Sequence, residues 1–120
     1  MDIFLDNIPT SIQPILVDFI EIMQTHYGEE LHGILLYGSY AREEAHEESD
    51  IDVLVVLNRT EMDAHEEALS IVEQTHMLDV EYGQILSAMP ISLEYWLNGD
   101  SFFLDQVKKD VIVIWEHARV

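Results

Sequence analysis

Two short motifs, ten residues apart, carry the side chains with which this chain could do chemistry. Gly38-Ser39 follows an apolar run at 31–37, and Asp50-Ile51-Asp52 begins a second apolar run. A Gly-Ser turn offers backbone N–H groups and a hydroxyl to a phosphate. Side chains alternate along a strand, so Asp50 and Asp52 are expected to project from one face, where they could share Mg²⁺. The two motifs together indicate chemistry on the phosphates of a nucleoside triphosphate.

The residues between and around these motifs extend the pattern. The segment at 38–57 reads GSYAREEAHEESDIDVLVVL and resembles the GSxARGxxxxxSDxDxxV signature of the minimal nucleotidyltransferases, small relatives of the DNA polymerase β superfamily. The resemblance implies that ATP is the substrate and Mg²⁺ the cofactor. It also implies that Asp50 and Asp52 are catalytic metal ligands. The positions that match or nearly match are Gly38, Ser39, Ala41, Arg42, Ser49, Asp50, Asp52 and Val55.

The same resemblance implies that Gly38, Ser39, Arg42 and Ser49 bind the nucleotide. Arg42 has two interpretations that the sequence leaves open. As the one cation in the loop, it could contact phosphate bidentately, or it could pair with Glu44 or Glu48.

Two departures from the family pattern bear on activity. Glu43 stands where the family usually has glycine, and we expect its side chain and charge to hinder a triphosphate. The superfamily also has a third carboxylate on a neighbouring strand, whereas the expected strand at 84–91 contains no acid. Asp79 and Glu81, just before that strand, are the nearest candidates. The alternative is that neither serves.

Composition narrows the class of protein. At 120 residues, of which 48% are hydrophobic, we expect one globular domain over 1–120. No apolar run approaches the ~18 residues of a membrane span, and the first residues carry no basic segment. The chain has no cysteine, which fits a cytoplasmic protein.

The charge is extreme for a chain of this size. There are 24 Asp and Glu against 5 Lys and Arg, a net charge of −19. Such a field repels phosphate backbones, so we expect no direct binding to nucleic acid. It favours Mg²⁺ and a partner with a basic surface, although solubility alone would also account for it.

Periodicity and turn signals predict an α/β fold with a small mixed sheet flanked by helices. The first helix should hold Ile12 to Met23, with Thr10 or Ser11 as its N-cap. A longer helix should run from a cap at Thr60 to about Leu78. The other expected elements are strands at 31–37, 50–57, 84–91 and 111–115 and helices at 92–98 and 102–109.

Three functions fit these observations. Minimal nucleotidyltransferases are commonly antitoxins paired with HEPN-family ribonuclease toxins, and members transfer AMP from ATP to a tyrosine of the toxin. That resemblance, together with the acidic charge, predicts protein AMPylation of a HEPN toxin. The alternatives are an antitoxin that blocks the toxin by contact alone, and a transferase acting on a small molecule such as an aminoglycoside.

Overall fold

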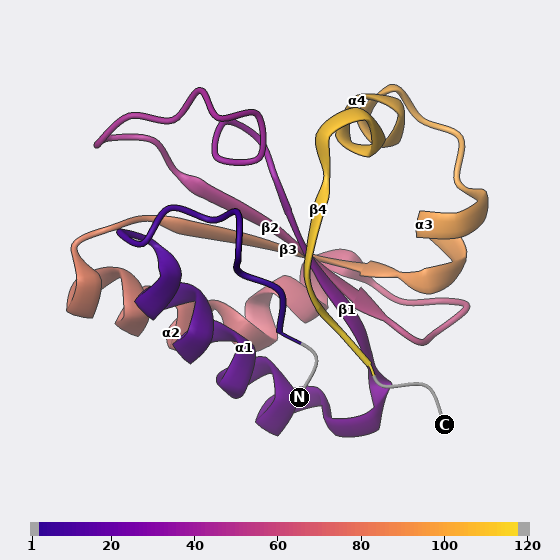
Figure 1. Ribbon diagram of the computed structural model, residues 1–120. Helices are drawn as coiled ribbons and strands as arrows, with labels where there is room; N and C mark the ends of the chain where they lie inside the picture. Colours follow the sequence, from indigo (N-terminus) through magenta and orange to yellow (C-terminus); the bar gives the residue numbers. More distant parts are fainter. Residues whose placement is uncertain (1–2, 118–120) are drawn as a thin grey trace.

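A four-stranded mixed sheet lies between two sets of helices, as the ribbon in Figure 1 shows. The computed structural model describes residues 3–117, so the two ends of the predicted 1–120 domain lie outside the described residues. The predicted fold class is confirmed. In chain order the elements are α1 (Gln13–Tyr27), the 3₁₀ turn η1 (Gly28–Glu30), β1 (Leu31–Tyr37), β2 (Ile51–Leu57), α2 (Ala64–Tyr82), β3 (Leu86–Ser92), α3 (Leu93–Asn98), α4 (Phe102–Asp110) and β4 (Ile112–Glu116).

The strand order is β3-β2-β1-β4, so the two strands flanking the Gly-Ser turn are the central ones. β1 pairs antiparallel with both β2 and β4, whereas β3 runs parallel to β2. One buried cluster joins α1 and α2 to one sheet face, and a second joins α3 and α4 to the other. Both faces of β1 and β2 are therefore covered, which explains why their sequences are almost continuously apolar.

The first helix begins later than predicted. Its N-cap is Ile12, which makes no side-chain capping bond, so the prediction of Thr10 or Ser11 as cap is wrong. Ile12 is fully buried in the core, and that burial fixes the start of the helix in place of a polar cap. Pro14 lies in the first turn, where its missing N–H costs least.

The long helix α2 is displaced toward the C-terminus relative to the prediction. Its N-cap is Asp63, whose carboxylate accepts from the N–H of Glu66 at 3.1 Å, so Thr60 is not the cap. It continues past Leu78 to Tyr82 and ends at Gly83, which has a left-handed φ of 65°.

The remaining boundaries differ from the prediction by small shifts. The third strand begins two residues after the expected start at 84, because Gly83 and the loop after it complete the turn from α2. The last strand begins at Ile112 and not at 111, since Val111 is the C-cap of α4. The second strand begins at Ile51, so Asp50 lies directly before it.

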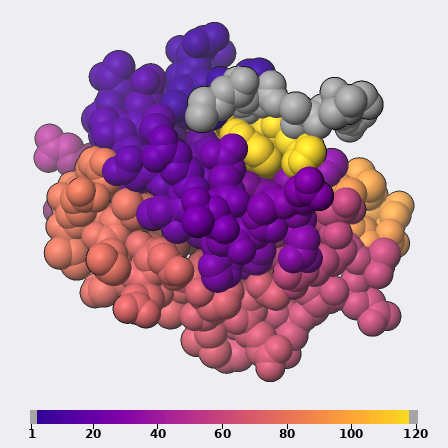
Figure 2. Space-filling view, turned by 90° about the horizontal axis from the view of Figure 1, so that it is seen from below, coloured from indigo at the N-terminus to yellow at the C-terminus, as the bar shows by residue number. Residues whose placement is uncertain are grey.

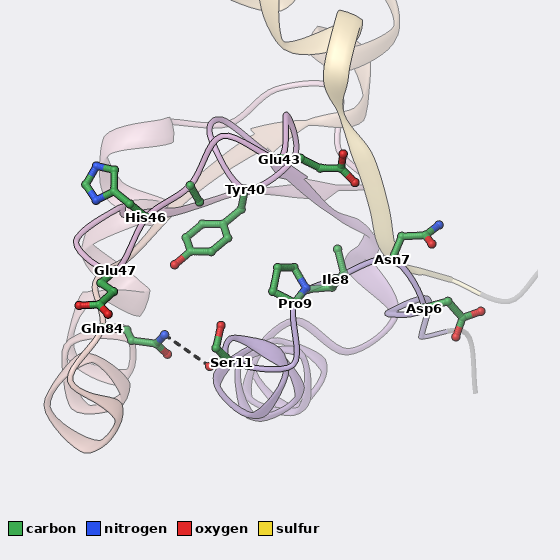
Figure 3. A pocket seen from close by; sticks show the side chains of 11 residues that line it. Asp6, Asn7, Ile8, Pro9, Ser11, Tyr40, Glu43, His46, Glu47 and Gln84 are labelled. Carbon is green, nitrogen blue, oxygen red and sulfur yellow. Dashed lines mark hydrogen bonds between the residues drawn. The ribbon is translucent and has the colours of Figure 1, made fainter.

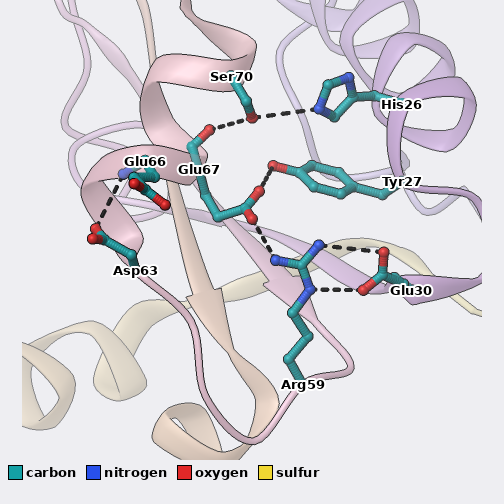
Figure 4. Close-up of polar contacts among 8 residues, drawn as sticks. All are labelled: His26, Tyr27, Glu30, Arg59, Asp63, Glu66, Glu67 and Ser70. Atoms are coloured by element: carbon teal, nitrogen blue, oxygen red, sulfur yellow. Dashed lines mark hydrogen bonds and ion pairs between the residues drawn. The ribbon is translucent and has the colours of Figure 1, made fainter.

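A network of polar contacts fastens the end of β2 to the start of α2 (Figure 4). The Arg59 guanidinium donates to Glu30 at 2.7 Å and also to the carboxylate of Glu67. Glu67 in turn accepts from the hydroxyl of Tyr27 at 2.9 Å. The network therefore links α1, η1 and α2 through one arginine, away from the Gly-Ser turn.

Within residues 3–117, none of the helices is long and apolar enough to cross a membrane.

Candidate active site

The turn after β1 is one helical turn that opens with Gly38. The carbonyl of Gly38, at φ 76°, accepts from the N–H groups of Ala41 at 3.1 Å and Arg42 at 3.2 Å. The N–H groups of Ser39 and Tyr40 have no backbone partner within residues 3–117. As at the start of any helix, these free N–H groups can bind an anion such as a phosphate.

Glycine at position 38 is a steric requirement as well as a conformational one. A Cβ placed on Gly38 would overlap Oδ2 of Asp52 and lie 3.2 Å from its Cγ. Asp52 is the cross-strand partner of Tyr37, the residue directly before the turn. The turn and the carboxylate are thus packed in contact, so any ligand of Asp52 would also approach the turn.

Asp52 lies on the face of the sheet that α3 and α4 cover, and Asp50 lies directly before β2. They alternate with Ile51, which is buried on the α1 and α2 face, while Leu54 and Val56 share the side of Asp52. The prediction that both acids project from one face is therefore consistent with the register.

The charge of Asp50 acts on the carboxyl group of Asp52. Burial raises the pKa of Asp52, the negative charge of Asp50 raises it further, and the positive charge of Arg42 opposes both. Two crowded carboxylates with hard oxygen donors are a donor set suited to Mg²⁺, whose charge would relieve their repulsion. No group of three or more potential ligands occurs in residues 3–117.

For Arg42 the structure shows one of the two interpretations that the sequence left open, the local ion pair, and contact with a phosphate stays a prediction. Its Nε donates to Oε1 of Glu44 at 3.2 Å, the predicted local ion pair. Both side chains are largely exposed, and exposed pairs contribute little, about 0–1 kcal/mol. Because the charge of Arg42 also acts on Asp52, a phosphate bound there could displace Glu44 at small cost.

Ser49 holds the loop closed just before the first aspartate. Its Oγ accepts from the N–H of His46 at 2.9 Å, and its own N–H donates to the carbonyl of His46 at 3.0 Å. These paired bonds fix the approach to Asp50. Contact between Ser49 and a nucleotide stays a prediction.

Tyr37 is a packing residue beside the site. Its ring meets that of Phe103 on α4 edge to face, with centroids 5.8 Å apart. Burial and the nearby charge of Asp52 raise the pKa of Tyr37 to about 12, so the phenol stays protonated at neutral pH. The contact of Phe103 with Tyr37 beside the site was not predicted from the sequence, which showed only that Phe103 is apolar.

The strand beside Asp52 presents a serine where the superfamily has its third carboxylate. Ser87 on β3 is the register partner of Asp52, and paired residues of parallel strands point to the same face. Asp79 and Glu81 belong to α2, which packs on the other face. The carboxylate of Asp79 instead accepts from the N–H of Leu86 at 2.9 Å. The structure therefore brings neither predicted candidate to the two aspartates.

Glu43 occupies a backbone position suited to glycine. Its φ is 58°, and it is the one non-glycine residue with positive φ among residues 3–117. Left-handed backbone costs a non-glycine residue about 1 kcal/mol, which gives a physical reason for the glycine usual in the family pattern.

The side chain of Glu43 lines a hollow of about 790 Å³ between the loop and the segment before α1 (Figure 3). Asp6 and Glu47 line it too, and their charges oppose a triphosphate inside it. Neither Asp50 nor Asp52 lines the hollow. This hollow is therefore separate from the pair of aspartates.

Comparison with known proteins identifies the family. Residues 16–114 match the family model described as a nucleotidyltransferase domain. The chain belongs to that family. Among characterised sequences it is similar to the "Putative protein adenylyltransferase MJ1305" of Methanocaldococcus jannaschii, with 35% identity over 83 residues. The match takes in 67% of this chain and 53% of the relative, so the chain spans about half the length of the curated relative it matches.

Solved structures share the fold of this nucleotidyltransferase domain. A putative nucleotidyltransferase from Sulfolobus solfataricus has a TM-score of 0.57 at 18% identity, covering 86% of this chain and 78% of that one. A toxin-antitoxin crystal structure with AMP-PNP gives 0.56 at 22%, covering 83% and 73%. A complex of tri-AMPylated Shewanella oneidensis HEPN toxin with MNT antitoxin gives 0.54 at 18%, covering 88% and 72%. At these identities the likeness establishes the fold alone.

Proposed function

We propose that this nucleotidyltransferase domain transfers AMP from ATP to a tyrosine hydroxyl of a HEPN-family toxin and thereby neutralises it. The observation that carries the proposal is the packing of the Gly38 turn against the carboxylate of Asp52. This packing sets free N–H groups beside a crowded pair of acids. Phosphate binding and metal binding can then act on one nucleotide.

Each part of the site has a role in this reaction. Asp50 and Asp52 would hold Mg²⁺, which when bound offsets the negative charge of the phosphates. The N–H groups of Ser39 and Tyr40 would orient the phosphates, with Arg42 as the cation nearest to Asp52.

The acceptor hydroxyl attacks the α-phosphorus, a new P–O bond forms, and the bond to the leaving pyrophosphate breaks. The hydroxyl proton passes to water, because the position paired with Asp52 holds Ser87 and not a carboxylate. Activation of the acceptor must therefore come largely from the partner.

The comparisons support a protein acceptor. The curated relative carries the description "Putative protein adenylyltransferase", and related folds occur in toxin-antitoxin complexes. The net charge of −19 suits a partner with a basic surface and disfavours nucleic acid as a direct ligand. Since ATP is the donor and the chain has no cysteine, we place the reaction in the cytoplasm.

Intact-mass spectrometry of the partner tests the proposal. Co-expression with a candidate HEPN-family partner should add about 329 Da to that partner, or multiples of it, through one covalent bond per AMP. The variant Asp50→Asn/Asp52→Asn should abolish the addition. The matched control Glu73→Gln removes an exposed carboxylate on α2 and should leave it unchanged. Undiminished transfer by the double variant would refute the assignment of the site.

A second candidate is an antitoxin that acts by contact alone, and Ser87 and Glu43 are the observations that favour it. In that case the partner would be inhibited without a change of mass and without ATP. In either case the rate at which the chain associates with its partner would fall as salt is added, because charges near physiological ionic strength interact over a Debye length of about 8–10 Å.

A further inference from the structure

Two side-chain hydrogen bonds join helices α1 and α2, and two hollows lie along the helices between these bonds. The hydroxyl of Tyr82 donates to Asp18 at one end, and that of Tyr27 donates to Glu67 at 2.9 Å at the other. Between these ties lie two adjoining hollows, of about 430 and 480 Å³. We call this region the α1–α2 groove; it is lined by Glu21, Ile22, Thr25, Gln74, Met77 and Glu81. Figure 2 shows the face that carries it, with α1 in indigo to purple beside α2 in pink to orange.

The groove has apolar surface and one polar atom without a partner. Met77 on its α2 side is 66% exposed, and Ile22 lines both hollows. Gln74 also lines both hollows, and its Oε1 is buried with no hydrogen-bond partner. Leaving a buried acceptor unsatisfied costs free energy. A hydrogen bond from a donor in the groove to Oε1 of Gln74 would therefore be favourable once the amide turns toward it.

The charge around the groove is of one sign. Helix α1 carries two Asp or Glu and helix α2 carries five, and neither contains Lys or Arg. Glu21 and Glu81 lie at the groove itself. A second copy of this chain would bring like charges together, whereas a segment rich in Lys and Arg would be complementary.

We propose that the α1–α2 groove is a docking site for a basic amphipathic helix of a partner protein. Its apolar residues would pack on Ile22 and Met77, its cations would meet Glu21 and Glu81, and a donor would reach Gln74. The groove lies across the sheet from Asp50 and Asp52. Docking therefore does not depend on the proposed AMP transfer and leaves that site open.

A synthetic amphipathic peptide of Leu and Lys is the probe, with a control peptide that has Glu in place of every Lys. In titrations followed by ¹H–¹⁵N NMR, the Lys peptide should shift amide signals at 21–26 and 74–81, and the Glu peptide should not bind. Asp50→Asn/Asp52→Asn should bind the Lys peptide with the affinity of the wild type.

Two variants of α2 separate docking from general attraction to an acidic protein. Met77→Lys and Val72→Lys each add one positive charge at an exposed position, but only Met77 lines the groove. Met77→Lys should weaken the Lys peptide at least about tenfold and Val72→Lys at most about twofold, because only the first places a charge in the contact. Thermal unfolding of both variants checks that they fold.

Equal weakening by the two variants would overturn the proposal. So would shifts centred on the loop at 38–50, tight binding of the Glu peptide, or no binding of the Lys peptide.

Discussion

Replacing Gly38 by alanine should damage both the fold and the metal site, for two separable reasons. The backbone at Gly38 has φ 76°, which an alanine adopts only at a cost of about 1 kcal/mol. The new Cβ would also overlap Oδ2 of Asp52, so the carboxylate would have to leave its rotamer. An off-rotamer side chain costs about 0.5–1.5 kcal/mol.

Two other glycines provide controls for the first cost alone. Gly28 has φ 57° and Gly83 has φ 65°, and a Cβ on either would meet no atom within 4 Å. Gly83→Ala should therefore lose about 1 kcal/mol and Gly38→Ala about 2 kcal/mol, whereas Gly28→Ala, at a ψ of −130° that essentially only glycine adopts, should lose about 1–3 kcal/mol. For a domain of this size, each kcal/mol lowers the unfolding midpoint by about 4 °C.

Urea unfolding measures the loss of stability, and calorimetric titration with ATP-Mg²⁺ measures the loss of the site. Gly38→Ala should weaken ATP-Mg²⁺ binding at least about tenfold, since displacing a ligand carboxylate disturbs the coordination geometry. The two control variants should bind like the wild type. If Gly38→Ala is no less stable than Gly83→Ala and binds ATP-Mg²⁺ normally, the contact between the turn and Asp52 has no functional part.

Four further predictions follow from particular side chains. Glu43→Gly should tighten ATP-Mg²⁺ binding and stabilise the fold by up to about 1 kcal/mol, whereas Glu43→Gln keeps the backbone strain and should improve ATP-Mg²⁺ binding alone. Calorimetry measures the affinity and urea unfolding measures the stability. Equal affinity in the wild type and both variants would refute the charge effect. The pKa of Asp52 is raised in the folded state, so the folded chain binds the Asp52 proton more tightly than the unfolded chain does. Ionised Asp52 therefore destabilises the fold, and this loss of stability is regained as the pH falls through the pKa of Asp52. Asp52→Asn should therefore raise the unfolding midpoint at neutral pH and leave it unchanged in acid, and a lower midpoint at neutral pH would contradict this. Arg59→Met should lower the free energy of unfolding in urea by about 2 kcal/mol, because Glu67 loses its cationic partner. The affinity for ATP-Mg²⁺ should not change, since the partners of Arg59 lie away from the Gly38 turn. Ser87→Asp should raise AMP transfer about tenfold or more by adding a carboxylate beside Asp52, and unchanged turnover would show that activation does not limit the rate.

Local signals in the sequence were sufficient for the central elements of the fold. The strand at 31–37 was predicted with its observed bounds, because an apolar run ended by Gly38-Ser39 has one simple interpretation. The spacing of Asp50 and Asp52 predicted a common face, since side chains alternate along a strand; Asp52 lies in β2 and Asp50 directly before it. Cap positions were less secure: several polar residues precede each helix, and burial of Ile12 and the bond from Asp63 decided between them.

Tertiary structure alone decided what stands beside the two aspartates. The pairing of Ser87 with Asp52 depends on a parallel register across α2, and no local pattern encodes the offset between strands so far apart. The placement of Asp79 on the opposite face follows from the direction in which α2 packs. The contact between Gly38 and Asp52 arises because an antiparallel pair brings the end of β1 against the start of β2. The sequence by itself predicted the two aspartates as ligands, and the sheet determined which residues stand beside them, because register and packing are set by the whole core.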